Sequence, residues 1–366
     1  MTKKLKSDPV LFMVTIGLVC LSIVMVWSAS AVVAMERYQQ PYMFLMKQLM
    51  WAAIGLAVLW VAMGVDYVIY NQQKFIWACL GVVALCLVAV LFSPRVNNAH
   101  RWFNIGGLGI QPSEPAKIAT ILFIASVLER RLHRINEIGY SLLPIGLVVG
   151  LLVALILLEP DFGTSMSLVL IAGVMVFAAG LSYIYLAVGG LMLVPLAGVI
   201  LFGADYRRRR FTAFMHPWND PLGDGFQLIQ SLIAVGTGGV TGKGLMQGVQ
   251  KLFYLPEPHS DFIYAVISEE LGLVGATVVL VCFCVITWRG LRVAARAPDT
   301  FGAFLALGLT TMIAVQALVN ISVVLGMMPT KGIPLPFVSA GGSSLIINLL
   351  GMGILLNVSR HASSEA

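Results

Sequence analysis

The sequence predicts an all-α polytopic membrane protein with ten transmembrane helices and a long extracytoplasmic loop between the seventh and eighth. Only 11% of its 366 residues are charged, against about 25% in soluble domains. Apolar residues make up 59%, and the mean hydropathy is +0.91. A soluble multidomain protein or a disordered chain would need far more polar surface, so both classes are excluded.

A membrane-spanning helix needs about 20 mostly apolar residues, and segments of that kind recur along the whole chain. We interpret residues 1–366 as one membrane domain without internal repeats. The first segment follows Lys3, Lys4 and Lys6 but is too long for a signal peptide, and nine more come after it. The ten expected spans are about 10–34, 43–64, 75–93, 112–129, 141–158, 162–180, 182–203, 262–288, 301–326 and 343–359.

Basic residues predict the orientation. They gather at the amino terminus, in loops 129–140 and 289–300, and at Arg360 near the end. Ten spans put these segments on one side, which the positive-inside rule makes cytoplasmic. Arg207 to Arg210 then lie outside, at the start of the extracytoplasmic loop of about 204–260. Basic residues on the outer side run against the positive-inside rule, so we infer that these arginines bind an anion.

Titratable residues, prolines and glycines collect in the outer segments, whereas the inner loops are short. The sequence therefore predicts a polar site at the outer membrane surface. Nucleic-acid binding is disfavoured because no basic soluble face is present. The five cysteines all fall within apolar runs and contain no CxxC, so we interpret them as lipid- or core-facing residues.

Glu114 and Lys117 are three residues apart at the start of the fourth span and share a helix face. An ion pair that anchors the helix at the interface is one interpretation. A pair that lines a functional cavity is equally supported, because ionisable residues at membrane depth are usually interior and functional.

Glu257, His259 and Asp261 alternate just before the eighth span. An extended chain would point all three one way, and such a trio suits a divalent cation (Mg or Mn, with Glu257 and Asp261 as ligands) or a polarised base. A plain helix cap at Asp261 is the alternative.

Two further outer features have ordinary explanations. Residues 226–233 alternate apolar and polar types at helical spacing, which predicts an interfacial helix on the outer leaflet. The glycines of 236–248 lack the order of a phosphate loop, so we favour a flexible hinge near Lys243, although backbone amides there suit a pyrophosphate. Ser343 begins the last span, where a helix cap is favoured over an anion site.

Five outer segments together resemble the SEDS family (shape, elongation, division and sporulation) of bacterial peptidoglycan glycosyltransferases, and more its division branch than its elongation branch. Ser260, Pro115 and Ala340 depart from the usual residues of that family. The matching segments are Arg101-Trp102 through Gln111-Pro112-Ser113-Glu114 to Lys117, Glu159-Pro160-Asp161-Phe162-Gly163-Thr164, Asp220 to Ser231, Leu255-Pro256-Glu257 through Asp261-Phe262, and Pro329-Thr330-Lys331-Gly332 through Ser344.

The resemblance implies polymerisation of lipid II into glycan strands at the outer face of the bacterial inner membrane, at the division septum. It also implies a class B penicillin-binding transpeptidase and other division proteins as partners. By motif position Asp261 is the expected catalytic residue. The residues expected to bind the substrate are Glu114, Lys117, Arg101, Trp102, Arg207, Arg210, Glu257, His259, Lys331 and Ser343.

Three other functions compete with this interpretation: an elongation-type polymerase, a transporter that flips the same lipid, and a scaffold. Transporters commonly contain repeats and bind their cargo near the midplane, and neither feature is found in this sequence. A scaffold has no reason to collect acids and bases at a lipid interface.

Overall fold

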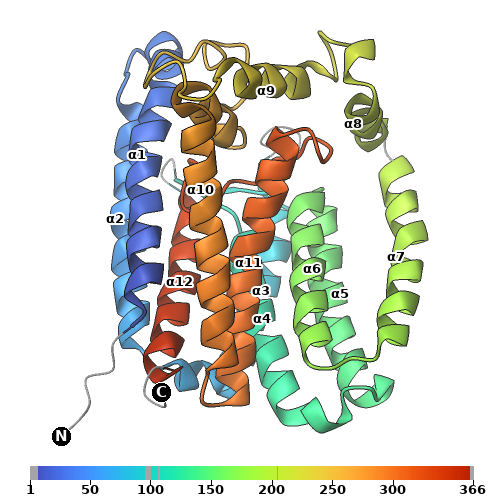
Figure 1. Ribbon diagram of the computed structural model, residues 1–366. Coiled ribbons are helices and arrows are strands. Elements are labelled where there is room, and N and C mark those ends of the chain that lie inside the picture. Colours follow the sequence, from blue (N-terminus) through green and yellow to red (C-terminus); the bar gives the residue numbers. More distant parts are fainter. Residues whose placement is uncertain (1–6, 95–99, 106–107, 204, 363–366) are drawn as a thin grey trace, which may run out of the picture.

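The computed structural model describes residues 7–94, 100–105, 108–203 and 205–362, and within this part the fold is a helical bundle with one small β-hairpin (Figure 1). The α-helices are α1 (Pro9–Tyr38), α2 (Met43–Gly64), α3 (Gln73–Val90), α4 (Ser113–Arg131), α5 (Leu143–Leu158), α6 (Phe162–Ala178), α7 (Tyr183–Phe202), α8 (Asp205–Met215), α9 (Phe226–Thr237), α10 (Ile263–Ala295), α11 (Thr300–Val324) and α12 (Gly342–Ala362). The strands are β1 (Phe103–Ile105) and β2 (Leu108–Ile110), and the single-turn elements are η1 (Tyr67–Asn71), η2 (Leu132–Arg134), η3 (Ile138–Leu142) and η4 (Pro217–Asn219).

Each of the ten predicted spans contains a helix close to the expected bounds. Seven described segments are long and apolar enough to cross a membrane, namely α1, α2, α3, residues 138–158, α10, α11 and α12. Three predicted spans, α4, α6 and α7, are not among these seven. α4 contains several charged residues, and α6 has only 17 residues. The chain is therefore a multi-pass membrane protein.

Capping residues define where several helices begin. The Asp8 carboxylate accepts hydrogen bonds from the backbone amides of Val10 and Leu11, and Asp299 accepts one from Gly302 at the start of α11. Asp161 does the same at α6, where it accepts from the amide of Thr164. These carboxylates satisfy amides that have no partner within the helix and sit favourably at its positive end.

The core of the bundle is formed by α11 and α12. In their apolar windows 72% and 78% of residues are buried inside the protein, against 22–39% for the other candidate spans. Glycines permit close helix contact here: a Cβ added to Gly353 would lie 2.7 Å from the Leu59 carbonyl oxygen of α2, and one added to Gly308 would lie 2.6 Å from Ile121 of α4. α4 is also buried along most of its length, and the other candidate spans pack around this core with a larger share of their side chains exposed.

The two ends of the bundle differ. Both termini and the basic helix ends at Arg131, Arg292 and Arg360 lie at one end, whereas α8 and α9 lie at the other (Figure 1). The predicted clustering of basic residues on one side is confirmed for the described residues; Lys3, Lys4 and Lys6 lie outside them. We call the end with α8 and α9 the outer end.

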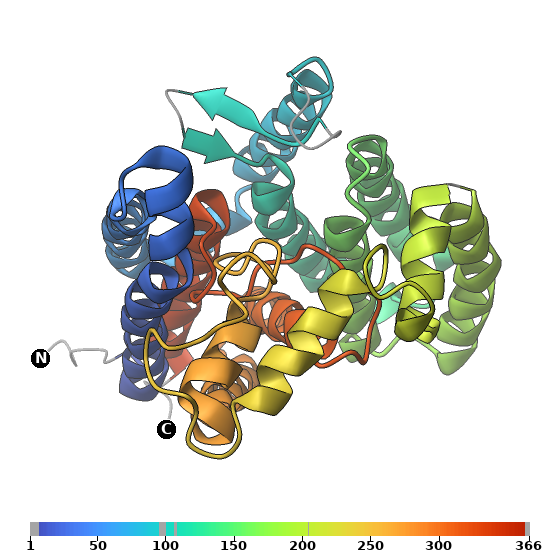
Figure 2. The ribbon, with the colours of Figure 1, turned by 90° about the horizontal axis from the view of Figure 1, so that it is seen from above.

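The outer end contains elements that the sequence pattern did not predict. β1 and β2 form an antiparallel hairpin between α3 and α4, and α8 is a separate helix that contains the four arginines. The predicted helix at 226–233 is confirmed as α9, which lies across this end (Figure 2). Its buried face, including Ser231, packs on protein, and the Ser231 hydroxyl donates to the Val324 carbonyl at 2.8 Å. α9 therefore packs on protein along its buried face, whereas the sequence predicted a helix that lies on the outer leaflet.

The glycine-rich stretch after α9 is not the flexible hinge that we expected. α10 is interrupted at Gly272, whose φ of +66° favours glycine. The backbone amides of Lys243 and Gly244 donate to the carbonyls of Glu269 and Glu270 at 3.0 Å each. A Cβ on Gly242 would lie 2.1 Å from the Glu270 carbonyl oxygen. The glycines thus allow close packing against the break in α10, and these two amides are not available to a pyrophosphate.

Candidate active site at the outer end

Asp261 lies directly before α10, where three segments of the chain meet. The side-chain amide of Asn320 in α11 donates to the backbone carbonyls of Asp261 and Ile333, at 2.8 and 2.7 Å. A Cβ added to Gly332 would lie 2.6 Å from Oδ2 of Asp261, so the carboxylate packs directly against the Lys331–Gly332 backbone. The hydrogen bond from Asn320 therefore fixes the backbone of Asp261 against α11 and the loop at Ile333.

The environment of Asp261 raises the pKa of its carboxyl group. Burial raises the pKa of its carboxyl to about 7, the negative charges of Glu257 and Asp161 add to the shift, and Arg210 and Arg101 oppose it. Among the residues that the structure describes, none donates a hydrogen bond to this carboxylate. A carboxylate with a pKa near the operating pH, and without an internal partner, is suited to general-base catalysis.

The charges of two arginines, Arg101 and Arg210, act on Asp261. Arg101 donates from Nε to the Glu159 carbonyl at 3.0 Å and from Nη2 to the Pro160 carbonyl. Arg210 of α8 donates from Nη1 to the Thr330 carbonyl at 3.1 Å. Together with Asp161 and Lys331 these residues form what we call the Asp261 cluster, which consists of Arg101, Asp161, Arg210, Asp261 and Lys331.

Lys331 completes the cluster from the loop between α11 and α12. Its ammonium lies 3.8 Å from the centroid of the Phe162 ring, a cation–π contact. Burial lowers its pKa to about 8, Asp161 opposes that shift, and Arg210 and Arg101 reinforce it. The pKa of Lys331 is thus close to that of Asp261.

Asp161 and Glu159 belong to the outer motif but were not among the expected site residues. The Asp161 carboxylate accepts hydrogen bonds from Gln111 at 3.0 Å and from the Thr164 hydroxyl at 2.7 Å. Glu159 is fully buried and neither of its carboxylate oxygens has a partner among the described residues. Burial raises its pKa to about 8, Asp161 adds to this and Arg101 opposes it. The sequence feature that marks these two residues is a pair of acids on either side of Pro160, directly after an apolar segment.

The expected trio of Glu257, His259 and Asp261 does not converge, so the extended-chain prediction is wrong. Residues 256–262 form turns, and Glu257 has a φ of +48°. Its carboxylate is 3.7 Å from Nε2 of His259 and its side chain is 59% exposed, whereas Asp261 faces Gly332. The His259 ring instead contacts the Phe44 ring, with the two centroids 4.6 Å apart. Burial lowers the pKa of His259, and the negative charge of Glu257 opposes that shift.

These residues also do not fit the divalent cation considered from the sequence. Within the described part of the chain, no three Asp, Glu, His or Cys side chains are placed to hold a metal ion together. We therefore assign no step of the chemistry to a metal.

Glu114 and Lys117 form the predicted ion pair in α4, with Nζ 2.9 Å from Oε2. The two side chains are only 3% and 1% exposed, so the pair is inside the protein and not at the headgroup interface. Gln111, which donates to Asp161, also donates to the Ser113 hydroxyl at 2.9 Å and so joins the start of α4 to the Asp261 cluster.

The other expected site residues lie at the outer end in different settings. The Trp102 ring covers Gly109 of β2, where an added Cβ would be 3.1 Å from the ring. Ser343 lies in the first turn of α12, and its hydroxyl is buried without a partner among described residues. Arg207 lies in α8, but its side chain is outside the described part.

Comparison with known proteins establishes the family. The model for the FtsW, RodA and SpoVE family, described as cell cycle proteins, matches residues 9–364. This chain belongs to that family, which confirms the resemblance drawn from the five segments.

Curated relatives match over nearly the full length. The chain is 42% identical to the "Probable peptidoglycan glycosyltransferase FtsW" of Geobacter sp. (strain M18), with 98% of each chain covered. It is also 42% identical to "Stage V sporulation protein E" of Bacillus subtilis (strain 168), with 99% of each covered.

Two solved structures share the fold. One, reported as "Structural coordination of polymerization and crosslinking by a peptidoglycan synthase complex", contains a chain that is 30% identical with a TM-score of 0.80, and 98% of this chain and 99% of that chain are covered. The other is the rod shape determining protein RodA of Thermus thermophilus, which is 26% identical with a TM-score of 0.71 and 97% of each chain covered.

Proposed function

We propose that this protein is a peptidoglycan glycosyltransferase that polymerises lipid II into glycan strands for septal wall synthesis. Family membership and the names of its relatives support this activity. The observation that carries the proposal is Asp261, a carboxyl group at the outer end with a raised pKa, no internal hydrogen-bond donor among the described residues and the charges of Arg101 and Arg210 acting on it.

In the proposed reaction Asp261 takes the proton from the 4-hydroxyl of the acceptor GlcNAc. The hydroxyl oxygen bonds to the anomeric carbon of the donor MurNAc, and the bond from that carbon to the phosphate oxygen breaks. The electron pair leaves with undecaprenyl pyrophosphate. A sugar hydroxyl is a weak nucleophile at neutral pH, so a positioned base accelerates the step by roughly 10²–10⁴-fold.

The leaving pyrophosphate gains negative charge as the bond breaks. Arg101 and Arg210 supply positive charge near the base, and Lys331 adds a third cation near these two arginines. Arginine pairs with phosphate through charge-assisted, often bidentate, hydrogen bonds. Cations placed where charge develops stabilise the transition state more than the ground state. We assign Arg207, Trp102, Glu257, His259 and Ser343 to binding of the lipid-linked substrate around this centre.

The finer topology follows from the same proposal. All ten helices α1–α7 and α10–α12 cross the cytoplasmic membrane, and residues 204–260 form the extracytoplasmic loop between the seventh and eighth spans. α4 crosses despite its charges because Glu114 and Lys117 neutralise one another inside the bundle. The Asp261 cluster then faces the outer side, where lipid II displays its sugars.

A class B penicillin-binding transpeptidase and other division proteins are the proposed partners. Support comes from the solved peptidoglycan synthase complex, whose description joins polymerisation to crosslinking. Purified protein, assayed with labelled lipid II alone and with the transpeptidase, measures the polymerase and its dependence on the partner together.

Asp261→Asn tests the proposed chemistry. This substitution preserves size but removes the base, so polymer formation should fall by at least roughly 10²-fold while lipid II binding is retained. Asp224→Asn is the matched control, because Asp224 is an exposed carboxylate of the same outer segment. Titration with Mg²⁺ or Mn²⁺ should not rescue the variant; partial rescue would make Asp261 a cation ligand, and near-normal polymerisation would remove it from the mechanism.

A further inference from the structure

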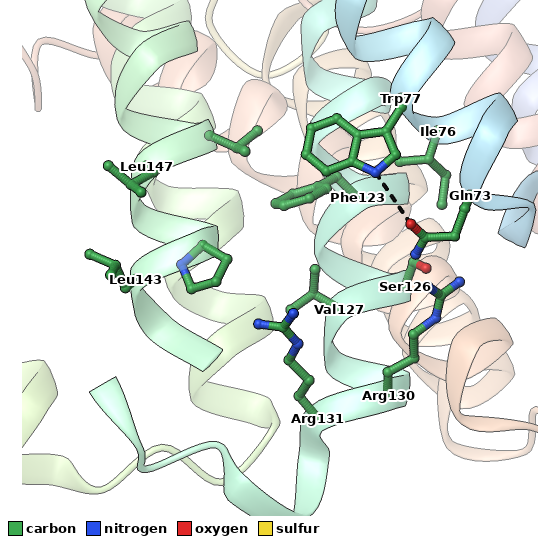
Figure 3. A pocket seen from close by; sticks show the side chains of 12 residues that line it. Gln73, Ile76, Trp77, Phe123, Ser126, Val127, Arg130, Arg131, Leu143 and Leu147 are labelled. Atoms are coloured by element: carbon green, nitrogen blue, oxygen red, sulfur yellow. Dashed lines mark hydrogen bonds between the residues drawn. The ribbon is translucent and has the colours of Figure 1, made fainter. Parts of the chain in front are cut away.

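A cavity of about 330 Å³ lies between α3, α4 and α5 at the end that carries both termini. It is lined by the first turns of α3 and α5 and by the last turns of α4 (Figure 3). This end is opposite the Asp261 cluster, so the cavity takes no part in the proposed reaction. By the positive-inside rule it faces the cytoplasmic leaflet.

The walls of the cavity are apolar and open to the side. Ile76 and Trp77 of α3, Phe123 and Val127 of α4 and Leu147 of α5 line it. The rings of Trp77 and Phe123 meet edge to face, with centroids 5.8 Å apart. Trp77 is 56% exposed and Leu147 64% exposed. Two of the side chains that line the cavity are therefore on the outer surface of the bundle, where lipid surrounds a membrane protein.

The cytoplasmic end of the cavity is strongly basic. Arg130 and Arg131, in the last turn of α4, lie at its lower end in Figure 3, with Trp77 and Phe123 above them. Neither arginine forms an ion pair within the described part of the chain. Arg131 donates to the Tyr140 carbonyl and stacks on that ring at 4.7 Å, and Arg130 has only a 3.5 Å contact with the Asn71 carbonyl.

The neighbouring carboxylates make their contacts with other residues and not with Arg130 or Arg131. Glu129 accepts a hydrogen bond from Asn71 at 2.7 Å, and Glu137 pairs with Arg134 at 2.6 Å. The amino termini of α3 and α5 lie at the same end and add partial positive charge. The mouth of an apolar cavity thus has an unbalanced positive potential.

A second observation indicates a polar ligand inside the cavity. Ser126 lines it and is only 2% exposed, yet its hydroxyl has no hydrogen-bond partner among the described residues. It lies one turn above Arg130, between the basic mouth and the apolar walls. Buried hydroxyls are normally hydrogen-bonded, so a ligand oxygen at this depth would satisfy it.

We propose that this cavity binds one anionic phospholipid of the cytoplasmic leaflet. The phosphate lies between Arg130 and Arg131, an ester oxygen accepts from Ser126, and an acyl chain runs along Phe123 and Trp77. Basic pockets between helices on the cytoplasmic side are typical sites for anionic headgroups. From Arg131 to Phe123 the helix rises about 12 Å, close to the roughly 15 Å of one leaflet.

Quenching of Trp77 by brominated lipids tests this site. The full-length protein is reconstituted into vesicles that contain either phosphatidylglycerol or phosphatidylcholine with dibrominated acyl chains. The protein has seven tryptophans, so the difference between the wild type and Trp77→Phe isolates the Trp77 signal. We expect phosphatidylglycerol to quench this signal at concentrations about 10- to 30-fold lower than phosphatidylcholine, as two arginines near the surface predict.

Arg130→Gln/Arg131→Gln should abolish the preference for phosphatidylglycerol. Arg292→Gln/Arg296→Gln, which removes two charges from the same end but outside the cavity, should retain it. Equal quenching by both lipids in the wild type would overturn the proposal, as would the same loss in the control. Absence of quenching by either lipid would mean that protein, such as an acidic partner helix, fills the cavity. The wild-type comparison decides the question even if the double variant fails to fold.

Discussion

At the level of single residues, burial brings an acid and a base of the Asp261 cluster to nearly the same pKa. Asp261 rises to about 7 and Lys331 falls to about 8, each mainly because desolvation disfavours its charged form. Between these values the carboxyl group is ionised while the lysine is still protonated. The proposed reaction needs both forms, one to accept a proton and one to bind phosphate.

We therefore expect a bell-shaped pH profile for kcat/KM. Activity should fall below about pH 7, because Asp261 becomes protonated, and above about pH 8, because Lys331 loses its charge. Lys331→Arg should move only the alkaline limb upward, since arginine is not deprotonated in proteins. Glu159 also has a pKa raised to about 8, so Glu159→Gln is the control: if it moves the limb and Lys331→Arg does not, the limb belongs to Glu159.

Lys117→Ala tests whether the buried pair in α4 serves the reaction. The substitution leaves Glu114 buried without its cation, and it should impair polymerisation while the protein still inserts into the membrane. Removing one partner of a buried pair costs about 3–5 kcal/mol, so thermal unfolding is measured in parallel. The double variant Glu114→Gln/Lys117→Met should recover stability but not activity. Recovery of both would make the pair structural, and unchanged polymer from Lys117→Ala would exclude any role in the reaction.

At the level of elements, the break in α10 and the glycine-rich segment form one unit. Glu270, fully buried, accepts hydrogen bonds from Lys251 at 2.6 Å, from Ser28 of α1 at 2.7 Å and from the Met246 amide at 3.0 Å. Glu269 pairs with Lys243 at 2.7 Å and accepts from the Val249 amide. Two adjacent carboxylates thus hold the outer segment just before Asp261 against α10 and α1.

Glu270→Gln should lower the free energy of unfolding by about 3–5 kcal/mol, because it leaves the Lys251 ammonium buried without its counter-charge. Thermal unfolding in detergent measures this loss. Glu137→Gln is the matched control: its pair with Arg134 has side chains about half exposed, and such pairs contribute about 0–1 kcal/mol. Similar losses in both variants would contradict the anchoring role of Glu270.

At the level of the whole molecule, the two ends of the bundle have different chemistry. The end with the termini carries the short basic connections, and the outer end carries the Asp261 cluster, the hairpin and α8 with its arginines. Lipid II polymerisation and anionic lipid binding would therefore take place on opposite faces of one membrane.

Cysteine labelling tests the orientation of the chain across the membrane. In a background without the five native cysteines, Asp224→Cys should react with a membrane-impermeant maleimide in intact spheroplasts. Arg296→Cys should react only after the membrane is permeabilised. Labelling of both in intact cells, or a reversed pattern, would contradict the orientation that basic residues predict.

Much of the secondary structure could be predicted because a lipid environment constrains the sequence directly. Every backbone polar group in a bilayer needs an internal partner, so a long apolar run has few alternatives to a helix. The end of the bundle that carries the polar motifs followed from counting spans and basic loops. Asp261 and Lys331 were recognised by motif.

Other parts of the site required the tertiary structure, because they depend on contacts between residues far apart in the chain. Spacing along the chain does not specify which basic residues pair with Glu269 and Glu270, and their partners, Lys243 and Lys251, come from a segment that folds back on α10. The spacing of Glu257, His259 and Asp261 suggested an extended chain with one common face, yet the chain turns at Glu257, which contacts His259 at 3.7 Å while Asp261 faces Gly332.

The sequence by itself determined that this protein is a multi-pass helical membrane protein with its polar motifs at one end, since hydropathy and charge act locally along the chain. Only the tertiary structure decided which charges meet. It placed Arg101 and Arg210 near Asp261, left Glu159 buried without a hydrogen-bond partner among the described residues, and opened the basic cavity beside Ser126 at the other end. The physical reason is that burial and Coulomb interactions depend on distance in space, and spacing along the sequence does not specify that distance.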